Sequence, residues 1–176
     1  MRKMKRIVFL LLFSVLIVNS YAQKFDISKV TVGGSFGMQF GNYTMITVAP
    51  QVGYNFTNYL NAGAGISYSF YKDKYHSGSD RVVEKSNYAG FNVYGRLYIV
   101  EYLVLQAQPE INYMTNKVEY PNSNRPDVKT EKAVPSFLVG AGFRMGPAVA
   151  MLQYDLVQDA YSPYGTRIFY GISFSF

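Results

Sequence analysis

The stretch Leu60-Asn61-Ala62-Gly63-Ala64-Gly65-Ile66-Ser67-Tyr68-Ser69-Phe70 alternates apolar side chains with small or polar ones over its whole length. Successive side chains of a β-strand point to opposite faces of the sheet, so this alternation predicts a strand. Its second face carries asparagine, glycine and serine but no charge. We therefore predict a strand whose two faces meet different surroundings.

The same two-residue period returns seven more times along the chain. The other runs cover residues 30–40, 45–54, 91–97, 103–113, 137–143, 148–154 and 168–176. This pattern predicts eight strands in all. Pro50 and Pro109 fall inside two of them, and a proline has no N–H for the ladder, so we expect a bulge or a local gap in hydrogen bonding at each.

The connections between these runs alternate in length. Short links lie near residues 57–58, 100–101 and 145–147, and longer ones cover residues 71–87, 115–133 and 157–165; the first hairpin, at 41–43, is short although it belongs to the long side. Residues 72–85 and 116–132 hold 14 of the 24 charged residues that follow position 22. Long loops outside the cell, with tight turns and both mature termini in the periplasm, are typical of outer-membrane barrels.

The composition of the two strand faces decides which one points outward. A water-soluble barrel has a charged exterior, whereas the polar face here is mostly Gly, Ser, Thr, Asn, Gln and Tyr. Aromatic residues gather near both ends of the apolar face, with smaller aliphatic residues between them. The upper group is Phe40, Tyr68, Phe70, Tyr113 and Tyr154, and the lower group is Tyr54, Phe56, Phe174 and Phe176. Two aromatic girdles indicate a lipid-facing surface, so the predicted fold class is an all-β, eight-stranded antiparallel up-and-down transmembrane β-barrel.

The N-terminus predicts export from the cytoplasm. Four basic residues in Met1–Arg6 precede an apolar run from Ile7 to Val18, and Ser20 and Ala22 are the small residues of a cleavage site. A membrane anchor is the alternative, but this run is shorter than the roughly 20 residues that a spanning helix needs. We therefore expect a signal peptide at 1–22, cleaved after Ala22, and a single barrel domain at 23–176.

Charge and cysteine content exclude several classes of function. The signal holds four of the 17 basic residues and none of the 11 acidic ones, so the mature chain carries 13 against 11. The basic character of the full chain therefore does not indicate a nucleic-acid partner. There is no cysteine, which excludes disulfides, thiolate metal sites and a lipid-modified cysteine.

The last eight residues, Phe169-Tyr170-Gly171-Ile172-Ser173-Phe174-Ser175-Phe176, resemble the C-terminal signal that the outer-membrane assembly machinery reads. Gly171, Phe174 and Phe176 match that pattern, and Phe169 departs from it because a polar residue is expected there. With the signal peptide and eight strands, the mature chain resembles small porin-like outer-membrane proteins of the OmpA-barrel and OmpX type. The resemblance implies outer-membrane lipid and the assembly machinery as partners.

The inward face carries a small set of charges. These are Arg96, Glu110, Arg144, Asp155 and Arg167, with Tyr94 and Tyr98 beside them. An eight-stranded barrel is just wide enough for side chains to fill it, and buried charges need partners. We expect a plug of paired charges, with Asp155 opposite Arg167 across the last hairpin; a gate or narrow ion path is the alternative.

The sequence predicts no catalytic, metal or cofactor site. The one histidine, His76, lies beside Ser77 and near Asp80 in a predicted surface loop, and neighbouring loop residues rarely hold catalytic geometry. Carboxylates are scattered and show no metal-ligand spacing. Gly33-Gly34-x-x-Gly37 lacks the following lysine and helix of a phosphate-binding loop.

Three hypotheses for function remain open. The first is a non-enzymatic structural or surface-interaction barrel, with an extracellular ligand at 71–87 and 115–133. The second is a narrow channel for ions or small solutes. The third, an enzyme that modifies lipid in the outer leaflet, has the least support because the chain shows no catalytic group of the kind that hydrolysis needs.

Overall fold

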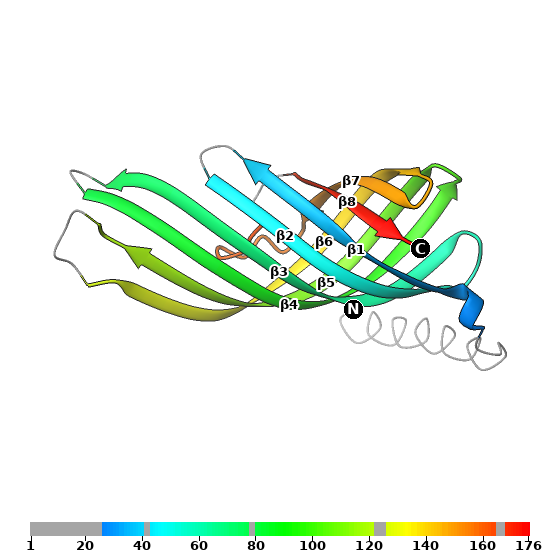
Figure 1. The fold of residues 1–176 in the computed structure, drawn as a ribbon, viewed down its shortest axis with the longest axis horizontal. Coiled ribbons are helices and arrows are strands. Elements are labelled where there is room, and N and C mark those ends of the chain that lie inside the picture. Colours follow the sequence, from blue (N-terminus) through cyan, green and yellow to red (C-terminus); the bar gives the residue numbers. More distant parts are fainter. Residues whose placement is uncertain (1–25, 41–42, 78–79, 122–125, 165–167) are drawn as a thin grey trace, which may run out of the picture.

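The computed structural model describes residues 26–40, 43–77, 80–121, 126–164 and 168–176. Eight antiparallel strands form a closed barrel in which each strand pairs with its neighbours in the chain, and β8 pairs with β1 (Figure 1). The bounds are β1 Val30–Phe40, β2 Tyr43–Asn55, β3 Leu60–Ser77, β4 Asp80–Val100, β5 Leu103–Glu119, β6 Val128–Met145, β7 Ala148–Asp155 and β8 Phe169–Ser175. The predicted fold class is therefore confirmed.

A short 3₁₀ helix, η1 (Ile27–Lys29), precedes β1. The Asp26 carboxylate accepts a hydrogen bond from the Ser28 backbone N–H at 3.0 Å and so caps this turn. In the described part of the chain, no helix is long and apolar enough to cross a membrane. The expected signal peptide, with its cleavage after Ala22, lies outside the described residues.

Two of the three predicted long loops are largely strand, so that part of the prediction was wrong. β3 and β4 remain paired as far as Ser77 and Asp80, and β5 and β6 as far as Val118 and Val128. The apolar alternation ends where these strands leave the lipid, because both of their faces are then polar. Hydrogen bonding between the backbones continues without it. Only the connection between β7 and β8 follows the prediction, as residues 156–164 form no strand.

These extensions make the barrel one-sided. β3, β4, β5 and β6 reach well beyond the other four strands, as the long green and yellow strands show in Figure 1. β7 ends at Asp155, opposite Leu138, whereas β6 begins ten residues further out at Val128. We call residues 71–77, 80–87, 115–119 and 128–133 the projecting wall.

The surface has the reverse polarity of a soluble barrel. Ile66 is 63% exposed and Phe91 is 51% exposed, whereas the neighbouring Asn92 is completely buried. Each strand therefore points apolar side chains outward and polar side chains into the lumen, which suits a wall surrounded by lipid. The predicted assignment of the two faces is confirmed.

The two strand prolines interrupt the ladder without changing its register. β2 and β3 pair at Val48 and again at Gln51, with a gap that contains Pro50. The β4–β5 ladder has a similar gap beside Pro109, between the pairs formed by Glu110 and Ala107. Of the two expected outcomes, the local gap is the one observed. Among the described strand pairs, the register shift between β4 and β5 lies elsewhere, near Tyr98.

Closure between β1 and β8 depends on a glycine. A Cβ at Gly37 would lie 2.0 Å from the Cζ atom of the Phe169 ring, which occupies that space. Phe169 is only 5% exposed and packs against the buried side chains of Met45 and Leu138. The ring at the start of β8 therefore sits inside the barrel at a position where β1 has no side chain.

Candidate functional site

The polar side chains of β5 form a continuous ladder inside the lumen. Gln106, Gln108 and Glu110 are inward neighbours on one strand, because every second residue shares a face. Gln106 Nε2 donates to Gln108 Oε1 at 2.8 Å, and Gln108 Nε2 donates to Glu110 Oε2 at 2.9 Å. Glu110 also accepts from Asn112 at 2.7 Å and from Ser67 at 3.2 Å.

Arg96 lies at the periplasmic end of this ladder and is 1% exposed. Its Nε donates to Gln106 Oε1 at 2.6 Å, and its Nη2 donates to Ser173 Oγ at 2.6 Å and to Gln51 Oε1 at 3.2 Å. The guanidinium carbon also lies 4.6 Å from the centre of the Tyr94 ring. Neutral acceptors and an aromatic face therefore surround this charge, and two glutamine amides connect it to Glu110.

Asp155 is completely buried, as the predicted plug requires. Its expected partner, Arg167, lies outside the described residues, so the pair stays a prediction. Asp155 accepts hydrogen bonds from the backbone N–H groups of Phe137 and Val157, both at 3.0 Å, and from Ser162 Oγ at 2.7 Å. Three neutral donors thus already stabilise this carboxylate.

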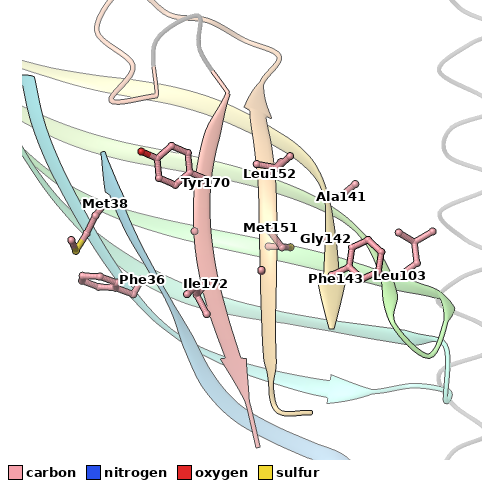
Figure 2. Close-up of a pocket in the computed structure, with 12 residues that line it drawn as sticks. Phe36, Met38, Leu103, Ala141, Gly142, Phe143, Met151, Leu152, Tyr170 and Ile172 are labelled. Atoms are coloured by element: carbon pink, nitrogen blue, oxygen red, sulfur yellow. The ribbon is translucent and has the colours of Figure 1, made fainter. Parts of the chain in front are cut away.

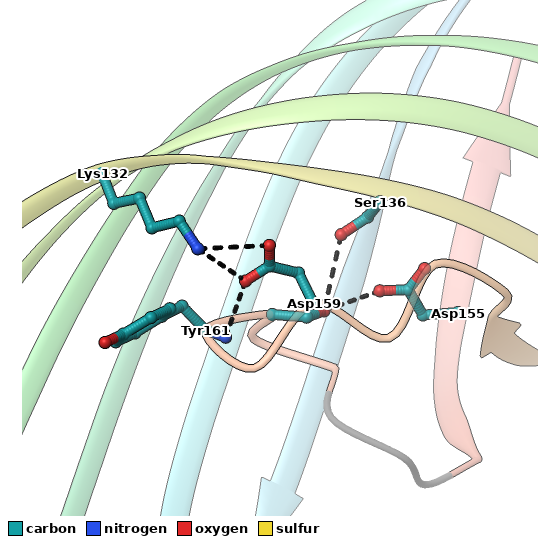
Figure 3. A network of polar contacts seen from close by, with 6 residues as sticks. Lys132, Ser136, Asp155, Asp159 and Tyr161 are labelled. Carbon is teal, nitrogen blue, oxygen red and sulfur yellow. Dashed lines mark hydrogen bonds and ion pairs between the residues drawn. The ribbon is translucent and has the colours of Figure 1, made fainter.

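The connection after β7 folds back against the inside of the barrel. We call residues 156–164 the plug segment. Its Tyr164 is 3% exposed and donates its hydroxyl to Glu110 Oε1 at 3.0 Å. Further out, Lys132 Nζ lies 3.2 Å from Asp159 Oδ1 and sits over the Tyr161 ring (Figure 3). The segment is therefore attached to two different heights of the barrel wall.

Above the plug segment, the projecting wall encloses an open vestibule of about 440 Å³. Asp73 and Glu84 are direct cross-strand partners on its inner face. Tyr71 donates its hydroxyl to Asp73 at 3.3 Å, and Asn116 donates to Glu84. Burial, together with Asp73, raises the pKa of Tyr71, so its phenol stays protonated. The other lining residues are Tyr43, Ser86, Tyr88, Met114, Ala160, Tyr161, Ser162, Pro163 and Tyr164.

Arg144 lies apart from the other predicted inward charges. It is exposed at the periplasmic mouth, where its Nε donates to the Gly146 carbonyl at 3.1 Å. Its guanidinium also lies 5.0 Å from the centre of the Tyr98 ring. The structure therefore connects Arg96, Glu110 and Tyr94 in one cluster and places Arg144 and Tyr98 at the rim.

His76 and Ser77 do not lie in a loop, as their backbones belong to the end of β3, opposite Arg81 and Asp80. Their side chains lie outside what the structure describes. No group of three or more His, Cys, Asp or Glu residues that could hold a metal ion occurs among the described residues.

One depression of the outer surface is almost entirely apolar. It has a volume of about 650 Å³ and crosses β6, β7 and β8, with Phe36 at one side and Phe143 at the other (Figure 2). The small side chains of Ala141 and Ala150 leave this part of the surface hollow between larger neighbours. This groove belongs to the lipid-facing surface.

Sequence reasoning missed several residues of the lumen. The inward phase of Gln51, Gln106, Gln108 and Ser173 was readable from the alternation, but uncharged side chains do not reveal their partners. Tyr164 gave no signal, because it lies in an irregular connection.

An apolar exterior, a polar interior filled by side chains and a closed ring of eight strands define an integral outer-membrane β-barrel. The chain belongs to the outer membrane protein β-barrel domain family, whose profile matches residues 8–160. The protein is therefore located in the outer membrane, embedded in its lipid.

Two solved structures are similar to this chain, and the first of them supports the fold. The Ail attachment invasion locus protein of Yersinia pestis is 14% identical, with a TM-score of 0.51 over 84% of this chain and 96% of Ail. A de novo designed transmembrane β-barrel is 13% identical, with a TM-score of 0.46 over 88% of this chain and 100% of the design. Among curated proteins, none matches the sequence significantly.

Proposed function

We propose that this barrel is a non-enzymatic surface-interaction protein that binds an extracellular ligand at its vestibule and projecting wall. The observation that carries the proposal is the contrast between the two ends of the lumen. The middle is filled, since Asn92, Arg96 and Asn112 are at most 1% exposed. The outer end opens into a cavity lined by tyrosines and two carboxylates.

The filled lumen argues against the channel alternative. Transport requires a continuous polar path, whereas the ladder of β5 and the inserted Tyr164 occupy the cross-section with mutual hydrogen bonds. Planar-bilayer recordings of the refolded protein test this point. We expect no stepwise current from the wild type. Stepwise current that Tyr164→Ala enlarges would favour transport instead.

The vestibule favours a ligand that carries positive charge, because Asp73 and Glu84 face the same cavity and complementary charge aids recognition. Purified barrel on peptide and glycan arrays can identify such a ligand. Asp73→Asn with Glu84→Gln should abolish that signal. The matched control, Glu119→Gln with Glu131→Gln, removes two carboxylates from the outer face and should retain it. Equal loss in both variants would contradict a vestibule site.

The proposal also includes export through a cleaved signal peptide and insertion by the outer-membrane assembly machinery. Cleavage after Ala22 would release the mature barrel into the periplasm, and the C-terminal strand would then engage the assembly machinery. Phe174 and Phe176 suit this role because they stay 42% and 76% exposed even after β8 has closed the barrel. N-terminal mass measurement tests the cleavage. Phe176→Ala should reduce the amount of protein in the outer membrane without changing its synthesis.

A further inference from the structure

Four lysines lie side by side on the outer face of the projecting wall. Lys72 of β3 pairs with Lys85 of β4, Lys85 pairs with Lys117 of β5, and Lys117 pairs with Lys129 of β6. We call these four residues the lysine row. Direct cross-strand neighbours are about 5 Å apart, and like charges at such positions destabilise a sheet. Anions at the same height would therefore stabilise an in-register row of four cations.

Two tyrosines fix the height of the row relative to the membrane. Tyr68 and Tyr113 lie four residues below it on the same face and are 55% and 53% exposed. Their hydroxyls donate hydrogen bonds upward, to Asn87 at 2.9 Å and to Glu131. An apolar ring with a polar tip aimed outward is the arrangement of a side chain at a membrane interface.

The length of β4 places the membrane interface at the same height as these two tyrosines. The stretch of β4 from Ile99 to Ala89, whose alternate residues face outward, covers ten residue steps, or about 33 Å along the strand. A tilt of about 40° reduces this length to the roughly 25 Å of an outer-membrane apolar band. Lys85 lies four residues further out, about 10 Å above the band by the same reckoning. The row is thus level with the lipid headgroups.

The protein's own carboxylates neutralise the row only in part. Glu119 contacts Lys85 at 2.8 Å and Lys117 at 3.1 Å, and Glu131 contacts Lys129 at 2.8 Å. Lys117 also contacts Asp127, and Lys72 has no acidic partner among the described residues. These contacts are partly or fully exposed to solvent and therefore weak. Each ammonium group has three donors, so N–H groups remain for a further anion.

We propose that the lysine row binds the phosphorylated headgroups of lipids in the outer leaflet and so holds these lipids against the projecting wall. The opposite side of the barrel supports a one-sided contact. The outer faces of β1, β2, β7 and β8 carry no lysine or arginine among their described residues. Phosphate matches the site because it offers several acceptor oxygens to adjacent ammonium groups.

The test uses the full-length barrel in phosphatidylcholine vesicles that contain a minor amount of spin-labelled, bisphosphorylated lipid A or its dephosphorylated form. Electron paramagnetic resonance then measures how strongly each lipid is enriched at the protein surface. The wild type should prefer the phosphorylated lipid. Lys72→Gln with Lys85→Gln should reduce that preference at least about fivefold, the contribution of one lysine near an anionic surface.

Two matched variants control for charge and folding. Lys29→Gln with Arg144→Gln removes two cations from the periplasmic end and should leave the preference unchanged. Lys72→Arg with Lys85→Arg keeps the charge and should also retain it. Equal effects of the row variant and the periplasmic variant would overturn the proposal. So would equal enrichment of both lipids by the wild type, a comparison that needs no variant.

The bound phosphate could belong to a lipid headgroup or be free in solution. Adding inorganic phosphate as a competitor, at the concentration of the labelled lipid, distinguishes these two sources. The proposal requires that it leave the lipid bound, because a headgroup is held in the plane of the row and free phosphate is not. Displacement by inorganic phosphate would identify a general phosphate site and overturn the assignment to lipid.

Discussion

Replacing Arg96 by methionine should destabilise the folded barrel by about 3–5 kcal/mol, because each buried acceptor that loses its donor costs about 1–3 kcal/mol. The side chain is 1% exposed and donates to three acceptors, on Gln51, Gln106 and Ser173. Methionine fills similar space but leaves those oxygens without a donor. It also removes the buried cation that Gln106 and Gln108 connect to Glu110.

The electrostatic part of this loss follows from the register. Glu110 pairs with Asn92, and Arg96 lies four residues further along β4. The two charges are therefore about 13 Å apart along the strand direction. At an effective dielectric constant of about 20, opposite charges at that distance attract by about 1.3 kcal/mol. Glu110→Gln alone should also destabilise, because the new amide group faces donors such as Tyr164.

A double-mutant cycle measures the coupling. The chain has no tryptophan, so urea titrations are followed by the gel mobility that distinguishes folded from unfolded barrels. The double variant Arg96→Met with Glu110→Gln should be more stable than the sum of the single losses predicts, by about 1.3 kcal/mol. Arg144→Met, at the exposed periplasmic rim, is the control and should change stability by less than about 0.5 kcal/mol.

Additive effects would refute this reasoning. If the two single losses sum to the double loss within about 0.3 kcal/mol, local dipoles stabilise each charge independently. The two glutamine amides would then be neighbours of the charges and not a connection between them.

Three other predictions follow from the same barrel. Gly37→Ala should destabilise it by about 1–3 kcal/mol, and Phe169→Leu in the same chain should recover part of the loss in a urea titration, because the new methyl group meets that ring. The sequence alternation of the last hairpin predicts that Asp155 and Arg167 pair, so Asp155→Asn and Arg167→Gln should be non-additive by gel mobility. Additive losses would show that the two side chains do not pair. Lys85 and Lys117 lower the pKa of Glu119 by donating to its carboxylate, so this group adds stability above its unfolded-state pKa and loses it as the pH falls through the folded one. Wild type should therefore lose more stability than Glu119→Gln on acidification below pH of about 4.

Alternation alone determined the strands, their number and their two faces, because lipid outside and packed side chains inside impose opposite polarities on consecutive residues. The run from Leu60 to Phe70 already shows this alternation. The sequence also shows that most charged residues gather in connections that belong to one side of the predicted barrel. Beyond the membrane the same rule failed. Residues 72–77, 80–85, 116–119 and 128–132 are strand, yet both of their faces meet water or polar groups, so the sequence shows no apolar alternation there.

Only the tertiary structure decided how the lumen is filled. Gln106 and Gln108 are unremarkable in sequence, and they become a link between Arg96 and Glu110 because the barrel closes around them. Tyr164 enters the lumen from an irregular connection that has no pattern to read. The row that begins with Lys72 depends on the registers of three strand pairs. Such contacts join residues that are distant in the chain. The distances between their side chains are set by closure of the barrel, so they cannot be read from the local sequence.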